Sequence, residues 1–527
     1  MDPGESFNHA NKPLINASIM KTKSRTFSFF TASETANGLM STAQLKVLMG
    51  SLLSEFSLLA GITLVAAVLR FYKLGTWSFW GDEIFSVGFR EDGFNYSFLR
   101  RSLAGSMIHF ATTTLGTSEW SARLFPALIG MISVPILYFP IKRLFGASVA
   151  LLASGLLAVS PWHLYWSQNA RFYSLLLLFY TLALLYFAIG LEEDRPWFLL
   201  LSMIFLGLAA KERLVALFFI PVVLSYLFLL KILSIDNPLR QRLRYPLAFV
   251  ALGAVLSLFF VFPYIQNLNQ WLVGFGGPNN SPFWILAGTV SYVSLPVVCI
   301  GAVGALYFLL NKNRAILLVS LSATIPLVLM AGIALFHYSA NRYVFIILTS
   351  WTLLAALAVK ELFTHLKGHL RIFPVGLVCL LFIVLIKEDF LYYQYQNGNR
   401  PDWKDAFQFV QSHKGPGEII LSGNRELGDY YSQEKTSALD AFGIDNIKRS
   451  GVKVWIVDDW GAKDIHSDTI MWVEENAELV AVYDVWIQAR NFSMRVYLFD
   501  PVRSSSKENR SLMGIRNKEY ENENSRR

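Results

Sequence analysis

Two adjacent carboxylates, Asp82 and Glu83, are the residues with the clearest chemical potential in this sequence. They end the segment Trp77–Glu83 (WSFWGDE), which follows an apolar run. Tryptophan is typical of the membrane–water interface, and ionisable groups at that depth often have a functional role. A carboxylate there can take a proton from an attacking hydroxyl group, as a general base does. A solvated acidic pair beside an aromatic belt is the structural alternative, and the dipeptide alone does not decide between them.

Cations in three other polar clusters suit an anionic ligand. The clusters are Trp166–Tyr173, Lys211–Arg213 and His337–Tyr343, each at the end of an apolar stretch. Arginine offers a planar fork to phosphate oxygens, and lysine acts as a compact point charge. We therefore expect a phosphate-bearing ligand near these clusters. The alternatives are pairing with lipid head groups and, for Lys211, pairing with Glu212.

Metal ligands give a weaker signal. The sequence has no pair of histidines at ligand spacing and no cluster of Cys and His, so a structural zinc site is not expected. Hard divalent cations bind carboxylate oxygens, so a cation at Asp82 and Glu83 stays open as an alternative. Cys299 and Cys379 lie inside apolar runs and indicate no disulfide framework.

The composition indicates which elements must position these residues. The 527 residues are 54% hydrophobic and only 16% charged, whereas soluble domains carry about 25% charged residues. The net charge of +8 does not indicate a nucleic-acid partner, because the basic residues are scattered between apolar runs and form no stripe. We therefore predict a polytopic, all-α membrane bundle.

Eleven apolar runs reach or approach the length that a bilayer-spanning helix needs. They are 51–69, 124–140, 144–162, 172–191, 197–210, 214–230, 245–264, 283–310, 315–336, 343–359 and 372–386. The segment between Arg70 and Arg123 is expected to form a long first outer loop with amphipathic helices on the membrane surface. The charged residues cluster at the ends of the runs, and broken helices are not expected.

Basic residues in short loops predict the orientation, because cytoplasmic loops are enriched in Lys and Arg. One set of alternate loops contains Lys142, Arg143, Arg195, Lys231, Arg240, Arg242, Arg244, Lys312, Arg314, Lys360, Lys367 and Arg371. The opposite set contains only Arg171, Lys211, Arg213 and Arg342. This asymmetry predicts a cytoplasmic amino terminus in the cell membrane. With eleven spans, the carboxyl-terminal portion is then extracytoplasmic.

Strand and helix patterns alternate after the last span. Helical patterns at 403–412 and 465–476 separate short apolar runs, which predicts a small α/β domain. These runs are 418–421, 452–457, 479–485 and 494–499. We divide the chain into a disordered cytoplasmic tail (1–50), a transmembrane domain (51–386), an extracytoplasmic α/β domain (387–502) and a disordered tail (503–527).

Several motifs follow one another in a characteristic order. They are Leu69–Gly75 (LRFYKLG), Trp80–Glu83 (WGDE), Gly116–Leu124 (GTSEWSARL), Lys142–Gly146 (KRLFG), Ser160-Pro161 with Gln168, Ala170, Arg171 and Tyr173, then Asn341–Tyr343, Asp402-Trp403 and Gly417–Ile420. This set resembles the integral-membrane glycosyltransferases of the GT-C class. More narrowly, it is similar to the bacterial branch related to protein mannosyltransferases and the lipid A aminoarabinose transferase.

The resemblance implies a sugar donor linked to polyprenyl phosphate and an envelope acceptor, which is a lipid, glycan or protein hydroxyl group at the outer membrane face. It implies that Asp82 is the catalytic base and Glu83 its partner. The candidates for the donor phosphate or substrate are Arg171, Tyr173, Lys211, Arg342 and Tyr343. The sequence departs from the family at Ala104–Phe110, where many members have a His-Pro-Pro-type element, and at Lys211-Glu212, where related transferases have Lys-Gly.

The predicted reaction is a single displacement with inversion at the anomeric carbon. Two alternatives stay open. A transporter or flippase of lipid-linked sugars would show repeated halves or broken helices with charges near mid-span. A polysaccharide polymerase or ligase would have its large outer loop late among the spans, whereas here the large loop comes first.

Overall fold

The computed structural model describes residues 42–88, 102–235, 281–439, 451–459, 467–487 and 490–502. The chain divides into two units, Met1–Ser54 and Glu55–Arg527, and the candidate site lies in the second unit. The run at 245–264, the tail at 503–527 and most of the tail at 1–50 lie outside the described residues. The first helix begins at Thr42, inside the segment that we predicted as a tail.

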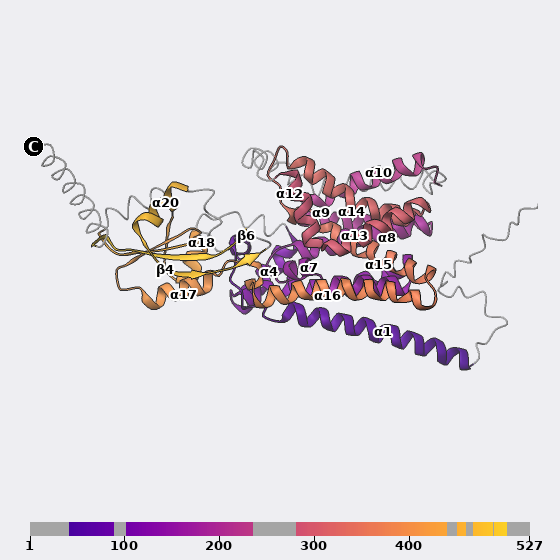
Figure 1. Cartoon of the computed structure of the whole chain (residues 1–527), viewed down its shortest axis with the longest axis horizontal. Coiled ribbons are helices and arrows are strands. Elements are labelled where there is room, and N and C mark those ends of the chain that lie inside the picture. Colours follow the sequence, from indigo (N-terminus) through magenta and orange to yellow (C-terminus); the bar gives the residue numbers. More distant parts are fainter. Residues whose placement is uncertain are drawn as a thin grey trace, which may run out of the picture. The chain divides into compact units, whose positions relative to one another are not determined.

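Helices form most of the described chain (Figure 1). The longer ones are α1 (Thr42–Phe71), α5 (Glu119–Phe145), α6 (Ala147–Ala158), α7 (Pro161–Ser167), α8 (Tyr173–Glu192), α9 (Pro196–Glu212), α10 (Phe219–Ile232), α12 (Pro282–Val293), α13 (Leu295–Leu310), α14 (Arg314–Ile333), α15 (Leu348–His365) and α16 (Ile372–Gln394). In the described part of the predicted first loop, between α1 and α5, lie the helices α2 (Gly81–Ser86) and α4 (Leu103–Leu115). Short 3-10 helices are η1 (Leu214–Phe218), η2 (Asn341–Ile347), η3 (Gly368–Arg371) and η4 (Asn397–Asn399).

The protein is a multi-pass membrane protein. Within the described ranges, seven helices are long and apolar enough to cross a membrane, or up to nine if each of two bent pairs is one span. The predicted count of eleven is therefore not confirmed. The expectation of unbroken spans is wrong at two places, because α6 and α7 are bent by 60° and α12 and α13 by 97°.

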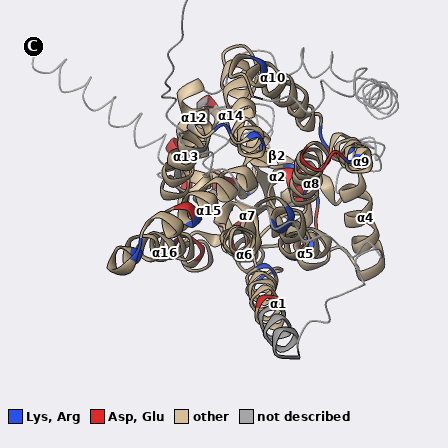
Figure 2. Ribbon diagram, turned by 90° about the vertical axis from the view of Figure 1, so that its right-hand side faces the viewer, with Lys and Arg blue, Asp and Glu red and all other residues tan. Residues whose placement is uncertain are grey.

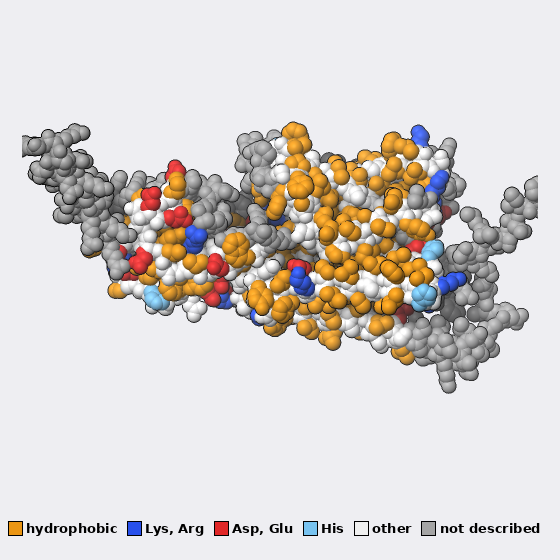
Figure 3. All heavy atoms as spheres, viewed as in Figure 1, with side chains coloured by type: hydrophobic (Ala, Val, Ile, Leu, Met, Phe, Trp, Pro, Cys, Tyr) orange, Lys and Arg blue, Asp and Glu red, His pale blue; other side chains and the backbone are white. Residues whose placement is uncertain are grey.

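The helices differ in how much of their surface the protein itself covers. In α8, and in the span formed by η2 and α15, 89% of the apolar window is buried, against 17% in α1 and α16. Figure 2 shows α10 and α16 at the periphery of the bundle, and few charged residues along its helices. Hydrophobic side chains cover much of the bundle surface in Figure 3. Ile383 and Phe390 of α16 are among the exposed hydrophobic residues. This surface suits contact with lipid.

The break between α6 and α7 is caused by local residues and is stabilised by Arg70, which is distant in the sequence. Ser160 caps α7 by accepting a hydrogen bond from the backbone of His163 (3.4 Å), and Pro161 occupies the first turn, where its missing N–H costs nothing. The carbonyls at the end of α6 accept from the buried Arg70, at 2.8 Å for Ala158 and 3.2 Å for Leu157. Arg70 thus satisfies carbonyls that the ended helix leaves open.

The carboxyl-terminal part contains a five-stranded sheet in the order β2-β1-β3-β7-β4. Its strands are β1 (Ile419–Ser422), β2 (Ser437–Ala438), β3 (Val454–Asp459), β4 (Glu478–Tyr483) and β7 (Met494–Phe499), and β5 (Trp486–Ile487) pairs separately with β6 (Arg490–Asn491). β1 runs parallel to β2 and β3, and β7 runs antiparallel to β3 and β4. The helices are α17 (Trp403–His413), α18 (Arg425–Ser432) and α20 (Ser467–Asn476). We call residues 400–502 the strand domain.

Two separate hydrophobic cores lie on the faces of this sheet. One core contains residues of α20, β3 and β7. The other contains Trp403 and Phe407 of α17 together with Phe79 and Ile84, which flank the acidic pair. The strand domain therefore shares a core with the segment that carries Asp82 and Glu83.

Candidate active site

Helix α2 separates the two carboxylates that the sequence places side by side. The carbonyl of Trp80 accepts hydrogen bonds from the backbone N–H groups of Glu83 (2.8 Å) and Ile84 (3.1 Å), which starts the helix. Successive helical residues are rotated by about 100°, so adjacent side chains cannot share a direction. The side chain of Asp82 is 26% exposed, whereas that of Glu83 is completely buried.

Asp82 meets two arginines from distant parts of the chain. Its Oδ2 lies 3.0 Å from Nη1 of Arg342, in η2, and 3.6 Å from Nη2 of Arg171, just before α8. Arg171 also donates to the backbone carbonyl of Asp82 (2.9 Å) and to Oγ of Ser86 (3.0 Å). Burial lowers the pKa of Arg171, and the carboxylate of Asp82 opposes that effect. The structure thus brings together three of the residues that the sequence nominated.

A buried hydroxyl group lies within electrostatic reach of these cations. The side chain of Tyr173 is buried, and its hydroxyl has no hydrogen-bond partner among the described residues. The charges of Arg342, Arg213 and Arg171 all act on it. The guanidinium of Arg213 lies 4.9 Å from the ring centre of Phe172. Three cations whose charges act on this hydroxyl form an environment suited to an anion.

Two aromatic rings border Arg342. Its guanidinium carbon lies 5.5 Å from the ring centre of Tyr343 and 5.8 Å from that of Trp80. Both distances are in the range of cation–π contacts. Tyr343, a predicted candidate for binding the donor phosphate or substrate, therefore lies beside the guanidinium of Arg342.

Lys211 precedes a carboxylate that binds the start of α4. The carboxylate of its neighbour Glu212 accepts hydrogen bonds from the backbone N–H groups of Leu103 (2.7 Å) and Ala104 (3.2 Å), at the start of α4. The charge of Lys211 acts on Glu212. Arg213, two residues after the nominated Lys211, adds positive charge that acts on Tyr173.

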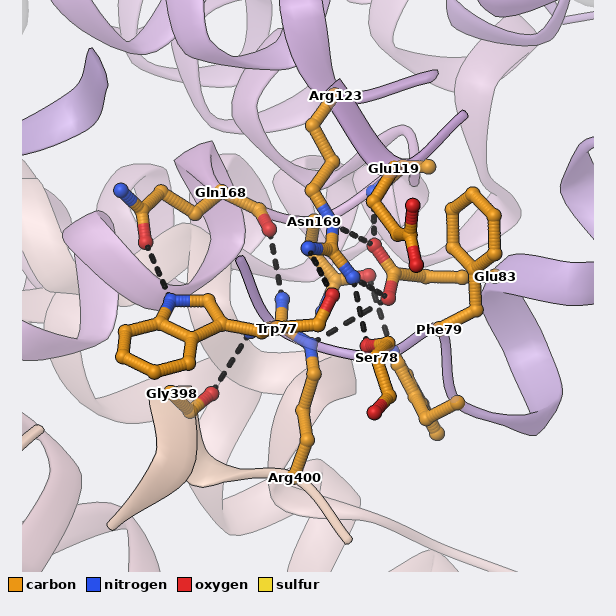
Figure 4. A network of polar contacts seen from close by, with 12 residues as sticks. Trp77, Ser78, Phe79, Glu83, Glu119, Arg123, Gln168, Asn169, Gly398 and Arg400 are labelled. Atoms are coloured by element: carbon orange, nitrogen blue, oxygen red, sulfur yellow. Dashed lines mark hydrogen bonds and ion pairs between the residues drawn. The ribbon is translucent and has the colours of Figure 1, made fainter. Parts of the chain in front are cut away.

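Glu83 is the centre of a buried polar network (Figure 4). Arg123 of α5 donates from Nε to Oε1 (2.8 Å) and from Nη2 to Oε2 (2.7 Å). The backbone N–H of Ala170 donates to Oε1 (2.7 Å), and Nε of Arg400 lies 3.4 Å from Oε2. Burial by itself raises the pKa of Glu83, but Arg123, Arg400 and the hydrogen bonds outweigh it, and the pKa is lowered.

The two arginines of this network also hold backbone carbonyls. Arg123 donates to the carbonyls of Trp77 (2.9 Å) and Ser78 (2.8 Å). Arg400 donates to the carbonyls of Gln168 (2.6 Å) and Gly398 (2.8 Å). The network therefore joins the segment before α2, the turn before Arg171 and the chain that follows α16.

Gly398 and Gln168 show how closely these segments approach. Gly398 has φ +60°, and a Cβ there would lie 2.5 Å from the ring of Trp77, so only glycine fits. The side-chain amide of Gln168 donates to the carbonyls of Arg70 (3.1 Å) and Tyr72 (2.7 Å) at the end of α1. The end of α1 is thereby fixed to the same network.

Sequence reasoning missed Arg123 and Arg400 as members of the site. Arg123 stood inside a family motif but carried no assigned role, and no pattern around Arg400 distinguished it from a linker residue. Glu83 and Asp82 are held by separate arginines, so the carboxylates do not converge on a shared cation. No group of three or more His, Cys, Asp or Glu residues that could hold a metal occurs in the part of the chain that the structure describes.

The fold and part of the sequence match known proteins. Residues 103–266 match the family model described as dolichyl-phosphate-mannose-protein mannosyltransferase. Crystal structures of ArnT from Cupriavidus metallidurans are similar at 15% identity. The apo state has a TM-score of 0.55 and covers 88% of this chain and 99% of that chain. The form bound to undecaprenyl phosphate has a TM-score of 0.52 and covers 83% and 97%.

A third solved structure widens the comparison. The Archaeoglobus fulgidus oligosaccharyltransferase, in complex with Zn and sulfate, has 12% identity and a TM-score of 0.52, and covers 83% of this chain and 72% of that chain. No curated protein matches the sequence. The chain thus has the fold of the GT-C class of integral-membrane glycosyltransferases, which confirms the resemblance that the motifs indicated.

Proposed function

We propose that this protein is a membrane glycosyltransferase that moves a sugar from a polyprenyl-phosphate donor to a hydroxyl group of an envelope acceptor. The observation that carries the proposal is the meeting of Asp82 with Arg171 and Arg342, in a chain with the GT-C fold. Undecaprenyl phosphate is bound in one of the similar ArnT structures, which supports a donor of this class. The acceptor is a lipid, a glycan or a protein.

The donor phosphate binds, in this proposal, where Asp82 now binds the arginines. A phosphate offers several oxygens to the planar forks of Arg171 and Arg342, and it competes for them with a single carboxylate oxygen. Tyr173 supplies a hydroxyl donor, Tyr343 a wall, and Arg213 additional positive charge. Lys211 contributes at longer range. The polyprenyl tail stays in the lipid against the apolar surface of the bundle.

The reaction then needs one proton acceptor and one stabilised leaving group. The acceptor oxygen attacks the anomeric carbon and forms the new C–O bond, while its proton passes to Asp82. The bond between the anomeric carbon and the phosphate oxygen breaks, and its electron pair leaves with polyprenyl phosphate. A general base contributes about 10²- to 10⁴-fold, and fixed charges on the leaving group stabilise the transition state further. A single displacement of this kind inverts the anomeric configuration.

The location of the reaction follows from the loop charges. We propose a cytoplasmic amino terminus, and transfer at the outer face of the cell membrane, where α2 and the strand domain lie together. We retain the segments 51–386 and 387–502 as the transmembrane and outer domains, although α16 continues to Gln394. The tails at 1–50 and 503–527 stay predictions, as does the absence of a nucleic-acid partner.

An assay with defined donors tests the proposal. The full-length protein in lipid nanodiscs is incubated with extracted envelope membranes and radiolabelled polyprenyl-phosphate sugars of several kinds. We expect a labelled acceptor with inverted anomeric configuration, formed at least about 100-fold more slowly by the Asp82→Asn variant. Retained configuration would reject the single displacement. Movement of the intact donor across proteoliposomes without sugar transfer would favour a flippase, and chain growth on the lipid itself would favour a polymerase.

A further inference from the structure

The strand domain contacts the segment before Asp82 directly. The backbone N–H of Phe79 donates to the hydroxyl of Tyr431, in α18, at 2.6 Å. That hydroxyl donates in turn to Oε1 of Glu119, at the start of α5 (3.0 Å). Tyr431 therefore joins three elements through one oxygen atom: the strand domain, the first helix of the bundle after the loop, and the backbone three residues before Asp82.

Ser78 makes a second connection of the same kind. Its hydroxyl donates to Oδ1 of Asp402 (3.3 Å) and accepts from the backbone N–H of Lys404 (3.0 Å). Both partners belong to the start of α17. The side chains of Phe79 and Ile84 lie in the core shared with α17, so polar and apolar contacts fix this segment from the same direction.

Arg400 reaches the other end of the segment. It is completely buried, and its guanidinium binds Glu83 as well as the carbonyls of Gln168 and Gly398. Burial lowers the pKa of Arg400, but Glu83 and the neighbouring tyrosines outweigh it, so the group stays charged. Glu83 already has a bidentate partner in Arg123, so Arg400 adds a link to the strand domain rather than a missing counter-charge.

Asp82 lies between these two attachments, on the same helical turn as Glu83. A shift of Phe79 or Glu83 therefore moves the carboxylate of Asp82. Arg342 lies in η2, whereas Arg171 follows the turn at Gln168 that Arg400 also binds. A displacement of about 1 Å at a reacting group can cost about 100-fold in rate. Binding of an anion to the arginines would tolerate the same displacement.

We propose that Arg400 and Tyr431 are positioning residues through which the strand domain sets the place of Asp82. The inference rests on the proposed function of Asp82 as the base. The strand domain is, on this account, a component of the active site that acts on the rate of transfer. It does not bind the donor.

Three variants of the full-length protein in nanodiscs test this. Arg400→Met should lower kcat about 100-fold, and Tyr431→Phe, which removes one hydroxyl group, about 2- to 10-fold. The donor KM should change by less than about twofold in Tyr431→Phe, because this hydroxyl binds Phe79 and Glu119 and not the phosphate-binding arginines. In Arg400→Met the fall in kcat should exceed any rise in donor KM, because Arg400 also binds the turn before Arg171. Arg495→Met is the matched control, because Arg495 forms a partly exposed pair with Glu474 in the strand domain, and it should behave like the unmodified protein.

Coupling distinguishes positioning from a general loss of structure. If Arg400 acts through Glu83, the loss in kcat of the double variant Arg400→Met with Glu83→Gln should be smaller than the product of the two single losses. A product of independent losses, or a rise in donor KM with unchanged kcat, would overturn the inference.

Hydrogen exchange gives a readout that needs no activity. The amide of Phe79 should exchange faster in Tyr431→Phe, and that of Glu83 in Arg400→Met, with unchanged exchange in Arg495→Met. Unchanged exchange of Phe79 in Tyr431→Phe would overturn the positioning role even if Arg400→Met folds poorly. Full activity of both variants beside a strongly slowed Asp82→Asn would reject the inference and leave the proposed function intact. Absence of transfer by the unmodified protein would reject the function alone, because exchange still reports the attachment.

Discussion

Asp82 and Glu83 are adjacent in sequence and opposite in environment. Glu83 is completely buried, accepts three hydrogen bonds of 2.7 to 2.8 Å, and has two arginines around it. Asp82 is 26% exposed and meets its two arginines through one oxygen, at 3.0 and 3.6 Å. The first carboxylate has every partner that it needs from the protein. The second has partners that a ligand can take over.

This difference distinguishes a carboxylate that stabilises the fold from one that is available to react with a substrate. A buried ion pair is costly to break, because the remaining charge stays desolvated. The two arginines that meet the partly open Asp82 can exchange its carboxylate for a phosphate, because the phosphate supplies the counter-charge that they lose. We infer that α2 uses Glu83 to fix its own position and Asp82 to act on the substrate.

Asp82→Asn should have the largest effect on turnover. The change keeps the shape of the side chain and removes the proton acceptor, so we expect kcat to fall by about 10²- to 10⁴-fold. The melting temperature should stay close to that of the unmodified protein. The exposed Asp405 provides a control, because Asp405→Asn makes the same change away from the arginines. Near-normal turnover of Asp82→Asn would remove Asp82 from the mechanism.

Glu83→Gln should lower stability as well as turnover. The variant leaves Arg123 and Arg400 buried without a counter-charge, which costs about 3 to 5 kcal/mol of folding free energy. Thermal unfolding in nanodiscs measures the loss. Glu434→Gln is the matched control, because its pair with Lys414 is 41% exposed on the Glu434 side and contributes less than about 1 kcal/mol. Equal melting of the two variants would contradict the structural role.

The buried position of Glu83 also predicts how the stability of the protein changes with pH. The pKa of Glu83 is lower in the folded protein than its ordinary value. Its contribution is therefore complete above the unfolded pKa, about 4.3, and is lost as the pH falls through the folded pKa. Stability of the unmodified protein should decrease more steeply below about pH 5 than that of Glu83→Gln. Parallel curves would show that Glu83 does not titrate with unfolding.

Arg171→Ala and Arg342→Ala should weaken use of the donor. Each variant removes charge-assisted hydrogen bonds worth about 1.5 to 3 kcal/mol, so donor affinity should fall by about 10- to 100-fold. Binding of polyprenyl phosphate alone, without a sugar, measures the effect separately from turnover. Unchanged affinity in both variants would place the phosphate elsewhere.

Much of this site could be predicted from the sequence, because apolar length is a local signal and the side of the membrane on which a loop lies follows from the order of the spans. Apolar length located α5, α8 and α14, and the alternation of loops placed Arg171 and Arg342 on one side with Asp82. The runs that became α17 and β7 were also read correctly from periodicity. Such features need no knowledge of which elements pack together.

The parts that could not be predicted depend on packing between distant segments. The division of labour between Asp82 and Glu83 follows from which face of a six-residue helix is buried, and no periodicity exists over that length. Arg400 lies 317 positions beyond Glu83 and contacts it only through the fold. The breaks before Pro161 and Leu295 did have local signals, since a proline lies in the first turn of α7 and of α13, but average hydropathy conceals them.

The smallest predicted effect distinguishes Arg213 from its neighbour Lys211 in the binding of polyprenyl phosphate. The charge of Arg213 acts on Tyr173 and Arg171, whereas that of Lys211 acts on Glu212 at the start of α4. Arg213→Ala should therefore weaken polyprenyl-phosphate binding by about fivefold, which corresponds to about 1 kcal/mol for a partly exposed charge. Lys211→Ala, its matched control, should change it by less than about twofold. A larger loss in Lys211→Ala would restore the residue that the motif nominated, and would mean that the phosphate lies nearer to α4 than to Asp82.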